Sequence, residues 1–382
     1  MKIRFVESIS AVPPEQWQRL QGTDNPFVDY RFLHALEQSG SVGGESGWQP
    51  HHLIISHDAG QLLGAVPSYL KQHSYGEYVF DWGWADAYRR AGLAYYPKLV
   101  CAVPFTPATG SRLLTVEQDE PQAGELRQQL AMELIEEARR RQLSSIHCLF
   151  LPRTEAELLT GGQGEWLARH DLQFHWQNQN YQQFGDFLAT FSSKKRKNVN
   201  RERRRVREAG VEMELLEGSE LSADHWRLFY QLYRLTAYKR GGTAYLTEQF
   251  FKLIADQMAD RVVMVLAKKG GEYVAAALNF RGGDALYGRY WGCLANFDSL
   301  HFETCYYRAI EYCIEEKIAR YEAGAQGEHK LSRGFMPTTT HSLHWLAHRQ
   351  FADAVADYLD QEREQISGYQ QVLQAHTPFR RG

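Results

Sequence analysis

Polar side chains that could carry out acyl transfer gather between residues 286 and 333. Attack of an amine on a carbonyl needs a base with a pKa near neutrality and donors for the tetrahedral oxyanion. The candidate bases are Glu303, Glu322, Glu328 and His329. The candidate substrate-binding residues are Arg289, Tyr290, Trp291, His301, Gln326, Lys330 and Arg333. Backbone amides around Gly324–Gly327, with Lys330 or Arg333, could serve the oxyanion or a phosphate.

A structural role is the alternative for each of these residues, because charged side chains at strand ends also form ion-pair networks. For the cluster as a whole we favour a functional site, since binding residues concentrate on loops that a rigid scaffold holds. A metal site is a further alternative, since His341, His344 and His348 add possible ligands, the last two at a spacing that shares a helix face. The segment has no H-E-x-x-H motif and no Cys joins the set, so we expect no metal.

A run of basic residues precedes this cluster. Between positions 194 and 207 there are nine cationic side chains and one acid, Glu202. The candidate phosphate- or donor-binding residues are Lys194, Lys195, Arg196, Lys197, Arg201 and Arg204. Phosphates of tRNA, of a nucleotide-linked precursor or of coenzyme A would suit such a helix, as would lipid headgroups. A solvated helix facing the acidic remainder of the chain is the alternative, although one-signed helices repel themselves without a partner.

One short segment has the pattern of a coenzyme A loop. Arg89-Arg-Ala-Gly92-Leu-Ala94 fits Q/R-x-x-G-x-G/A, in which backbone amides between a strand and a helix bind a pyrophosphate. The corresponding place in the second half, 296–303, lacks the pattern. A chance match is the alternative for so short a pattern.

Two α/β lobes are expected to position these residues. In the first, we predict strands over 3–6, 52–56, 62–71, 77–82 and 145–151, and helices over 14–20, 30–38 and 125–142. In the second, we predict strands over 211–216, 261–267, 274–280, 285–291 and 320–323, and helices over 193–209, 223–239, 247–258, 302–317 and 351–372. The segments 52–84 and 262–291 share a hairpin followed by an aromatic strand that ends in Trp, which suggests an internal repeat. Alternation would place Tyr78, Phe80, Trp82 and Trp84 on one face of that strand.

Bulk composition limits the class of protein. The 382 residues suggest two or three domains, and a 43% hydrophobic share supplies sizeable cores. A net charge of -3 gives no global attraction to nucleic acid, so such a partner would need a local basic patch. The N-terminus has no apolar signal region, no stretch is long enough for a membrane helix, and the five Cys form no C-x-x-C. We therefore expect a cytoplasmic protein with reduced thiols.

Several blocks spread along the chain resemble the Fem-like peptidoglycan biosynthesis/recognition family. They are Asn25-Pro-Phe-Val-Asp-Tyr-Arg-Phe-Leu, Phe80-Asp-Trp-Gly-Trp-Ala, Ser193-Lys-Lys-Arg-Lys, Leu286-Tyr-Gly-Arg-Tyr-Trp-Gly, Leu300-His-Phe-Glu-Thr-Cys-Tyr-Tyr and Tyr321-Glu-Ala-Gly-Ala-Gln-Gly-Glu-His-Lys. The resemblance implies a bacterial protein with two tandem GNAT-like domains, each a mixed sheet flanked by helices. We place these at 1–170 and 171–382, the second with the basic helix 193–209. Better-understood relatives attach amino acids from aminoacyl-tRNA to a cell-wall precursor peptide.

The leading hypothesis is a transferase that moves an acyl or aminoacyl group onto an amine, such as that of a cell-wall peptide precursor. The donor would be aminoacyl-tRNA or an acyl-CoA, and direct attack is favoured because no Cys or Ser has an obvious paired base. A second hypothesis is a module that recognises RNA or a phosphorylated cell-wall precursor without turnover. A third is an acetyl-CoA-dependent N-acetyltransferase.

Overall fold

The chain forms two compact units. The computed structural model describes residues 1–20, 22, 24–116, 120–239, 241–295, 297–325 and 327–380. Unit 1 comprises Met1–Leu172 and Thr339–Gly368, and unit 2 comprises Gln173–Thr338 and Tyr369–Gly382. The first boundary lies near the expected one at 170/171, whereas 339–368 belongs to unit 1 and not to the second half. The sequence gives no sign of this, because residues 341–346 join unit 1 by pairing with the distant strand Ser145–Leu151, and local patterns do not show such a pairing.

Unit 1 contains two groups of strands. One is a four-stranded sheet in the order β1-β3-β4-β7, formed by Lys2–Val6, His52–Ser56, Leu62–Val66 and Leu114–Thr115. In the other, the order is β15-β8-β6-β5-β2, formed by Met336–Leu346, Ser145–Leu151, Lys98–Cys101, Ser68–Lys71 and Trp48–Pro50. The predicted strand 62–71 is therefore divided between the two groups. Strands β6 and β8 run parallel, with Val100 opposite His147.

The helices of unit 1 bury an apolar stripe against these strands. They are α1 Pro14–Trp17, α2 Tyr30–Gln38, α3 Trp82–Arg90, α4 Glu120–Arg140, α5 Arg153–Thr160 and α12 Arg349–Ala375, the last of which ends in unit 2. Leu130, Leu134 and Ala138 of α4 recur at helical spacing and are fully buried. They join one hydrophobic cluster with Ile146 and Cys148 of β8, which is the core of this unit.

The predicted strand 77–82 is wrong. Residues 77–81 form a loop, in which Tyr78 has a positive φ of 64°, and α3 begins at Trp82. Alternating aromatics therefore do not mark a strand here, because the left-handed residue ends the extended backbone. The coenzyme-like segment 89–94 lies at the C-terminal end of α3, where the amides of Ala91, Gly92 and Leu93 bond to carbonyls of α3 itself. Those amides are not available to a pyrophosphate.

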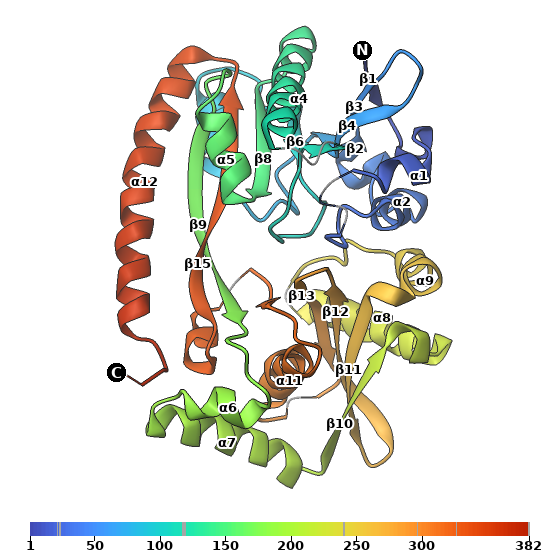
Figure 1. Cartoon of the computed structure of the whole chain (residues 1–382), viewed down its shortest axis with the longest axis vertical. Coiled ribbons are helices and arrows are strands. Elements are labelled where there is room, and N and C mark those ends of the chain that lie inside the picture. The colour runs from blue at the N-terminus through green and yellow to red at the C-terminus, as the bar shows by residue number, and fades with distance from the viewer. Residues whose placement is uncertain are drawn as a thin grey trace. The chain divides into compact units, whose positions relative to one another are not determined.

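Unit 2 is built on strands in the order β10-β11-β12-β13-β14-β9. They are Val211–Glu217, Val262–Lys269, Glu272–Arg281, Ala285–Cys293, Arg320–Glu322 and Leu167–Gln177, the last of which begins in unit 1. The helices are α6 Phe184–Ala189, α7 Ser193–Glu208, α8 Ala223–Lys239, α9 Glu248–Gln257, α10 Leu300–Phe302 and α11 Arg308–Glu315. Figure 1 shows α7 following α6 and leading into β10. The α/β class with mixed sheets flanked by helices is confirmed, as is the basic helix, which ends before Gly210 at a φ of 71°.

Candidate functional site

Two neighbouring strands of unit 2 part at the centre of the predicted cluster. β13 pairs in parallel with β14 from Ala285–Arg320 to Tyr287–Glu322. β14 ends there, whereas β13 continues to Cys293. At the parting point, a Cβ on Gly288 would lie 2.6 Å from the Tyr321 hydroxyl oxygen, so only glycine fits without a shift. From Gly288 onward β13 thus continues without β14 at its side, next to the loop that follows β14.

A π-helical turn lies beside this opening. Glu303–Tyr307 forms the turn between α10 and α11. The Tyr321 hydroxyl donates to the carbonyl of Cys305 in the turn at 2.5 Å and so ties it to β14. π-Helical turns are rare and frequent at functional sites, because the extra residue redirects side chains.

Lys330 is the most unusual residue of the opening. Its side chain is buried, with 1% of the residue exposed, and its Nζ donates to the carbonyl of Gly324 at 2.7 Å. A Cβ on Gly324 would lie 3.8 Å from the carbonyl oxygen of Gly288, so this loop lies against the parting point. Burial lowers the pKa of Lys330 to about 8. An amine poised near neutrality can hold or release a proton during a reaction.

Aromatic rings and imidazoles surround the π-helical turn. The Tyr306 hydroxyl lies 2.9 Å from Nε2 of His329, and burial lowers the pKa of His329. The His301 ring contacts the rings of Trp291 and Tyr306, with centroids 5.1 and 5.3 Å apart. The structure thus brings together four residues of the region, three of them predicted site residues.

The other two predicted residues of β13 have different surroundings. The Tyr290 ring contacts Tyr233 of α8, with centroids 5.2 Å apart, and so faces away from the Trp291 side of the strand. The guanidinium of Arg289 lies 5.3 Å from the Tyr290 ring centroid. Its charge lowers the pKa of Lys330, though less than burial does. Gln326 lies outside the described residues.

Glu303 is held by the basic helix. Arg203 of α7 donates to both carboxylate oxygens of Glu303, at 2.9 to 3.1 Å, and to Glu311 at 2.6 Å. Burial raises the pKa of Glu303, and the Arg203 cation opposes that rise. A carboxylate so enclosed is suited to fix the π-helical turn against α7 rather than to take a proton from a substrate.

A second ion pair joins α7 to the same region. Arg333 donates to both oxygens of Glu202, at 2.7 and 3.2 Å, and the Tyr307 hydroxyl also donates to Glu202. The Arg333 guanidinium lies 3.3 Å from the Phe302 ring centroid. Sequence reasoning missed Arg203 and Glu202; the only signal was that Glu202 is the single acid within the basic run.

The remaining two carboxylates occupy different surroundings. Glu322 is buried, with Arg320 at 3.1 Å and His175 of β9 at 3.9 Å. Glu328 is exposed and accepts a hydrogen bond from Tyr369 of α12. Neither of these contacts involves the residues that hold Glu303 or His329.

Most of the predicted cations of α7 are exposed to solvent. Lys194, Lys197, Arg201 and Arg204 are exposed, and Lys195 and Arg196 are half-buried. Buried Val199 and Val206, seven residues apart, attach the helix to unit 2. Arg204 pairs with Glu208 at 3.5 Å, whereas within the described ranges no carboxylate pairs with any residue from 194 to 197. The first turn is therefore a free cationic surface.

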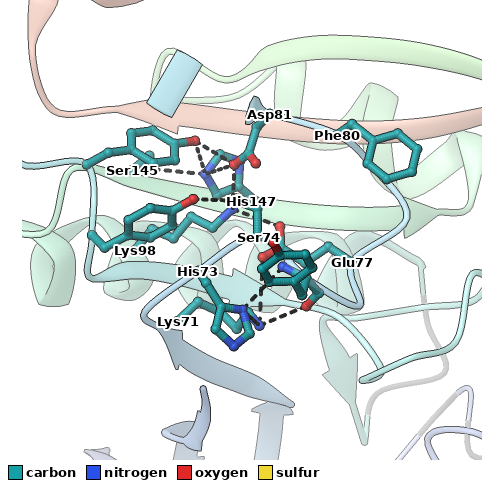
Figure 2. A network of polar contacts seen from close by, with 12 residues as sticks. Lys71, His73, Ser74, Glu77, Phe80, Asp81, Lys98, Ser145 and His147 are labelled. Atoms are coloured by element: carbon teal, nitrogen blue, oxygen red, sulfur yellow. Dashed lines mark hydrogen bonds and ion pairs between the residues drawn. The ribbon is translucent and has the colours of Figure 1, made fainter. Parts of the chain in front are cut away.

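A second polar cluster, which sequence reasoning missed, lies buried in unit 1 (Figure 2). Lys98 of β6 donates to Ser74 at 2.9 Å, to Glu77 at 2.8 Å and to Asp81. The Tyr95 hydroxyl also donates to Asp81, at 2.6 Å, and lies 3.2 Å from Nε2 of His147. The signal in the sequence was Lys98 itself, a charged residue at the start of the apolar run Leu99–Cys101, since a buried charge needs partners.

The titration of this cluster is strongly altered by its surroundings. Burial raises the pKa of Glu77 to about 7 and lowers that of Lys71, 4.0 Å away, to about 7. Burial also lowers the pKa of His147 to about 3, so its imidazole is neutral. Although burial opposes it, the Lys98 cation lowers the pKa of Asp81. Lys98 and Asp81 therefore stay ionised as a pair.

The described residues show no group of ligands for the metal site that was the alternative. In the part of the chain that the structure describes, no three His, Cys, Asp or Glu side chains gather as ligands. His341 and His344 lie on strand β15 rather than on a helix, and Nδ1 of His344 is 2.7 Å from Nδ1 of His147. No helix among the described residues has the length and apolar character needed to cross a membrane.

The chain matches the FemAB-like family, described as peptidoglycan biosynthesis/recognition, over residues 8–381, and it belongs to that family. Among solved structures, it is similar to FemX, with 11% identity, a TM-score of 0.54, and coverage of 93% of this chain and 100% of that one. It is also similar to the C-terminal domain of a putative lysylphosphatidylglycerol synthetase from Agrobacterium fabrum, with 10% identity, a TM-score of 0.50, and coverage of 90% and 96%. A tandem GNAT protein from clavulanic acid biosynthesis matches with 10% identity, a TM-score of 0.44, and coverage of 91% and 98%. No curated protein matches the chain.

Proposed function

We propose that this protein is an acyltransferase that moves an aminoacyl group onto an amine, such as that of a cell-wall peptide precursor. The observation that carries the proposal is the buried Lys330 amine, tied to Gly324 where β13 and β14 part. Next to the stretch of β13 that β14 does not cover, the Lys330 ammonium would give an acyl oxygen a counter-charge. Family membership supports the same class of reaction.

In the proposed reaction, the acceptor amine attacks the donor carbonyl directly. His329, kept neutral by its lowered pKa, takes the proton that the amine loses as the C–N bond forms. The Lys330 ammonium faces the negative charge on the carbonyl oxygen in the tetrahedral intermediate. As the intermediate collapses, the C–O bond to the donor breaks and the leaving oxygen takes the proton from the His329 imidazolium.

The carboxylates receive supporting roles in this proposal. We assign to Glu303 the positioning of the π-helical turn, because Arg203 occupies both of its oxygens. Glu322 is assigned a structural ion pair with Arg320. Glu328 lies next to His329 in the chain and is bonded to Tyr369, so it is a candidate for binding the acceptor rather than for proton transfer.

Aminoacyl-tRNA is the favoured donor over an acyl-CoA. The first turn of α7 offers cations without acidic partners, which suits a polyphosphate backbone. The coenzyme-like segment of unit 1 has its amides bonded within α3, which weakens the acetyl-CoA hypothesis.

The experiment is a single-turnover assay of the whole chain with charged tRNA or acetyl-CoA as donor, and with muropeptide-precursor or polyamine acceptors. We expect transfer from charged tRNA, reduced at least about a hundredfold by Lys330→Met. Lys252→Met is the matched control, since Lys252 is an exposed lysine of α9 in the same unit. Absence of transfer from either donor to any acceptor by folded protein would refute the proposal.

A recognition module without turnover is the second candidate, favoured by the free cations of the α7 first turn. It predicts salt-dependent binding of tRNA that is lost when residues 194–197 are neutralised and is unaffected by Lys330→Met. Transfer activity that depends on Lys330 would decide against it.

A further inference from the structure

The strand β1 lies at the edge of the four-stranded sheet in unit 1. Its residues, Lys2–Val6, pair antiparallel with β3, and no other strand among the described residues pairs with β1. In the same part of the chain, no backbone hydrogen bond outside the β1–β3 ladder involves residues 2–6. Because the N–H and C=O groups of successive residues in an antiparallel strand point to opposite sides, every second residue of β1 directs these groups outward. The outer edge of β1 can therefore accept one more strand.

A cavity of about 680 Å³ adjoins this edge. It is lined on one side by Ile3, Arg4 and Phe5 of β1, and on the other by residues of α4 between Glu133 and Arg140. Its volume is within the range of about 300–1,000 Å³ that is usual for ligand sites. A free strand edge with a helix beside it and a cavity between them is suited to strand addition, in which an extended peptide places every second side chain in the groove.

Alternation divides the side chains of β1 between two faces. Phe5 packs against the core cluster that contains Leu134 of α4, so Phe5 and Ile3 lie on the face toward the cavity. Ile3 is 41% exposed there. Lys2 and Arg4 lie on the opposite face, where both are exposed and neither pairs with a carboxylate of the described residues. An added strand would meet apolar side chains on one face and two cations on the other.

The α4 side of the cavity holds a carboxylate without a cation. Glu137 is enclosed by Arg140 and Arg141, each at 2.5 Å. The half-buried Glu133, by contrast, has no ion pair within the described ranges, and burial raises its pKa, as does the nearby charge of Glu136. A cationic side chain in the cavity would offset both effects on Glu133.

We propose that the groove between β1 and α4 binds an extended segment of a partner protein as an added strand. On one face of that segment, acids lie opposite Lys2 and Arg4. On its other face, apolar and basic side chains enter the cavity, where a base reaches Glu133. A second copy of this chain does not fit, because antiparallel pairing of two β1 strands centred on Ile3 or Arg4 sets cations directly opposite each other. This binding does not depend on the proposed transferase activity.

The test measures fluorescence anisotropy of a labelled octapeptide with the full chain. The peptide Glu-Val-Glu-Lys-Glu-Val-Glu-Lys has acids on one face of an extended strand and Val and Lys on the other. The control peptide Glu-Glu-Val-Lys-Lys-Val-Glu-Glu has the same composition and charge but mixes them on both faces. We expect saturable binding of the first peptide and binding about tenfold weaker of the second. Absence of binding by the first peptide, or equal affinity for both, would overturn the proposal.

Backbone methylation separates strand addition from attraction between charges alone. Methylation of the amide nitrogens at odd positions and at even positions of the first peptide gives two isomers, and only one set of these amides faces β1. We expect one isomer to lose about tenfold or more in affinity and the other to stay within about threefold of the parent. Equal affinities of the two isomers would rule out an added strand.

Variants of the chain test the two faces. Arg4→Glu sets acid against acid, so we expect about tenfold weaker binding, with Arg19→Glu as the control because Arg19 is also exposed in unit 1. Glu133→Gln should cost about threefold, with the exposed Glu125 of the same helix, as Glu125→Gln, for its control. Equal losses in a variant and its control would contradict the proposal. Binding that needs Glu133 but not Arg4, and that spermine displaces, would assign the cavity to a small cation instead and overturn it.

Discussion

Removing Arg203 tests whether Glu303 has a positioning role. Both side chains are largely buried, at 15% and 5% exposure, and Arg203 contacts both oxygens of Glu303. Arg203→Met leaves that carboxylate buried without its cation, so we expect a loss of about 3–5 kcal/mol in the free energy of unfolding. The control is Arg205→Met on the same helix, where the pair with Asp298 is exposed and worth about 1 kcal/mol or less.

The same variant has a pH signature. Burial raises the folded-state pKa of Glu303 above its ordinary value, so its contribution to stability is fully present in acid and is lost as pH rises through the folded pKa. Without Arg203 that pKa rises further, so the deficit of Arg203→Met should shrink between pH 7 and pH 5. Adding Glu303→Gln should likewise restore part of the lost stability, because no charge is then buried.

Urea denaturation followed by circular dichroism measures these differences. The reasoning fails if Arg203→Met costs no more than Arg205→Met, or if its deficit is the same at pH 5 and pH 7. A catalytic role for Glu303 would instead appear as a large loss of transfer rate in Glu303→Gln at unchanged stability.

Four further predictions concern the opening and the basic helix. Lys330→Met should raise the free energy of unfolding at pH 7 by roughly 1–3 kcal/mol. The folded state lowers the pKa of Lys330 to about 8, so the contribution of this lysine to stability is present at high pH and is lost as pH falls through about 8, whereas Met has no such loss. Urea denaturation measures this difference. The transfer rate of the unaltered chain should fall as pH rises through about 8, as Lys330 loses its proton, and a flat profile across that pH would refute its role. Gly288→Ala should cost about 1–3 kcal/mol through its clash with the Tyr321 hydroxyl, and Tyr321→Phe should relieve part of that cost in a double-mutant cycle. Exchange of Lys194 and Lys197 for Gln should lower the slope of log affinity for tRNA against log salt by about 1 to 2, as measured by filter binding.

Local periodicity predicted much of unit 2 from the sequence. The helix 223–239 is confirmed at both ends as α8, and Thr247 caps α9 through the amide of Phe250. These elements form where the spacing of apolar residues and the capping side chain agree. The prediction of a strand over 77–82 was wrong because Tyr78 has a positive φ, which ends the extended backbone and which the alternation of aromatic residues does not reveal.

The candidate site was predicted as a list of residues but not as an arrangement. Gathering of polar groups around two glycines pointed to the segment 324–333, and the structure brings His329 to Tyr306 and Lys330 to Gly324 there. Spacing along the chain did not show that Glu303 would be enclosed by Arg203, a hundred residues earlier. Contacts of that sequence separation depend on how sheets and helices assemble.

By itself, the sequence determined the family, the α/β class, the basic helix and the neighbourhood of the site, because these depend on residue types and short-range spacing. Only the tertiary structure decided which charges are enclosed and which are free. Arg203 and Lys194 belong to one basic run, yet Arg203 is buried in an ion pair and Lys194 is exposed. Lys98 and Lys330 likewise look like ordinary lysines in the sequence. Burial in a low-dielectric interior makes one a fixed anchor and gives the other a pKa of about 8.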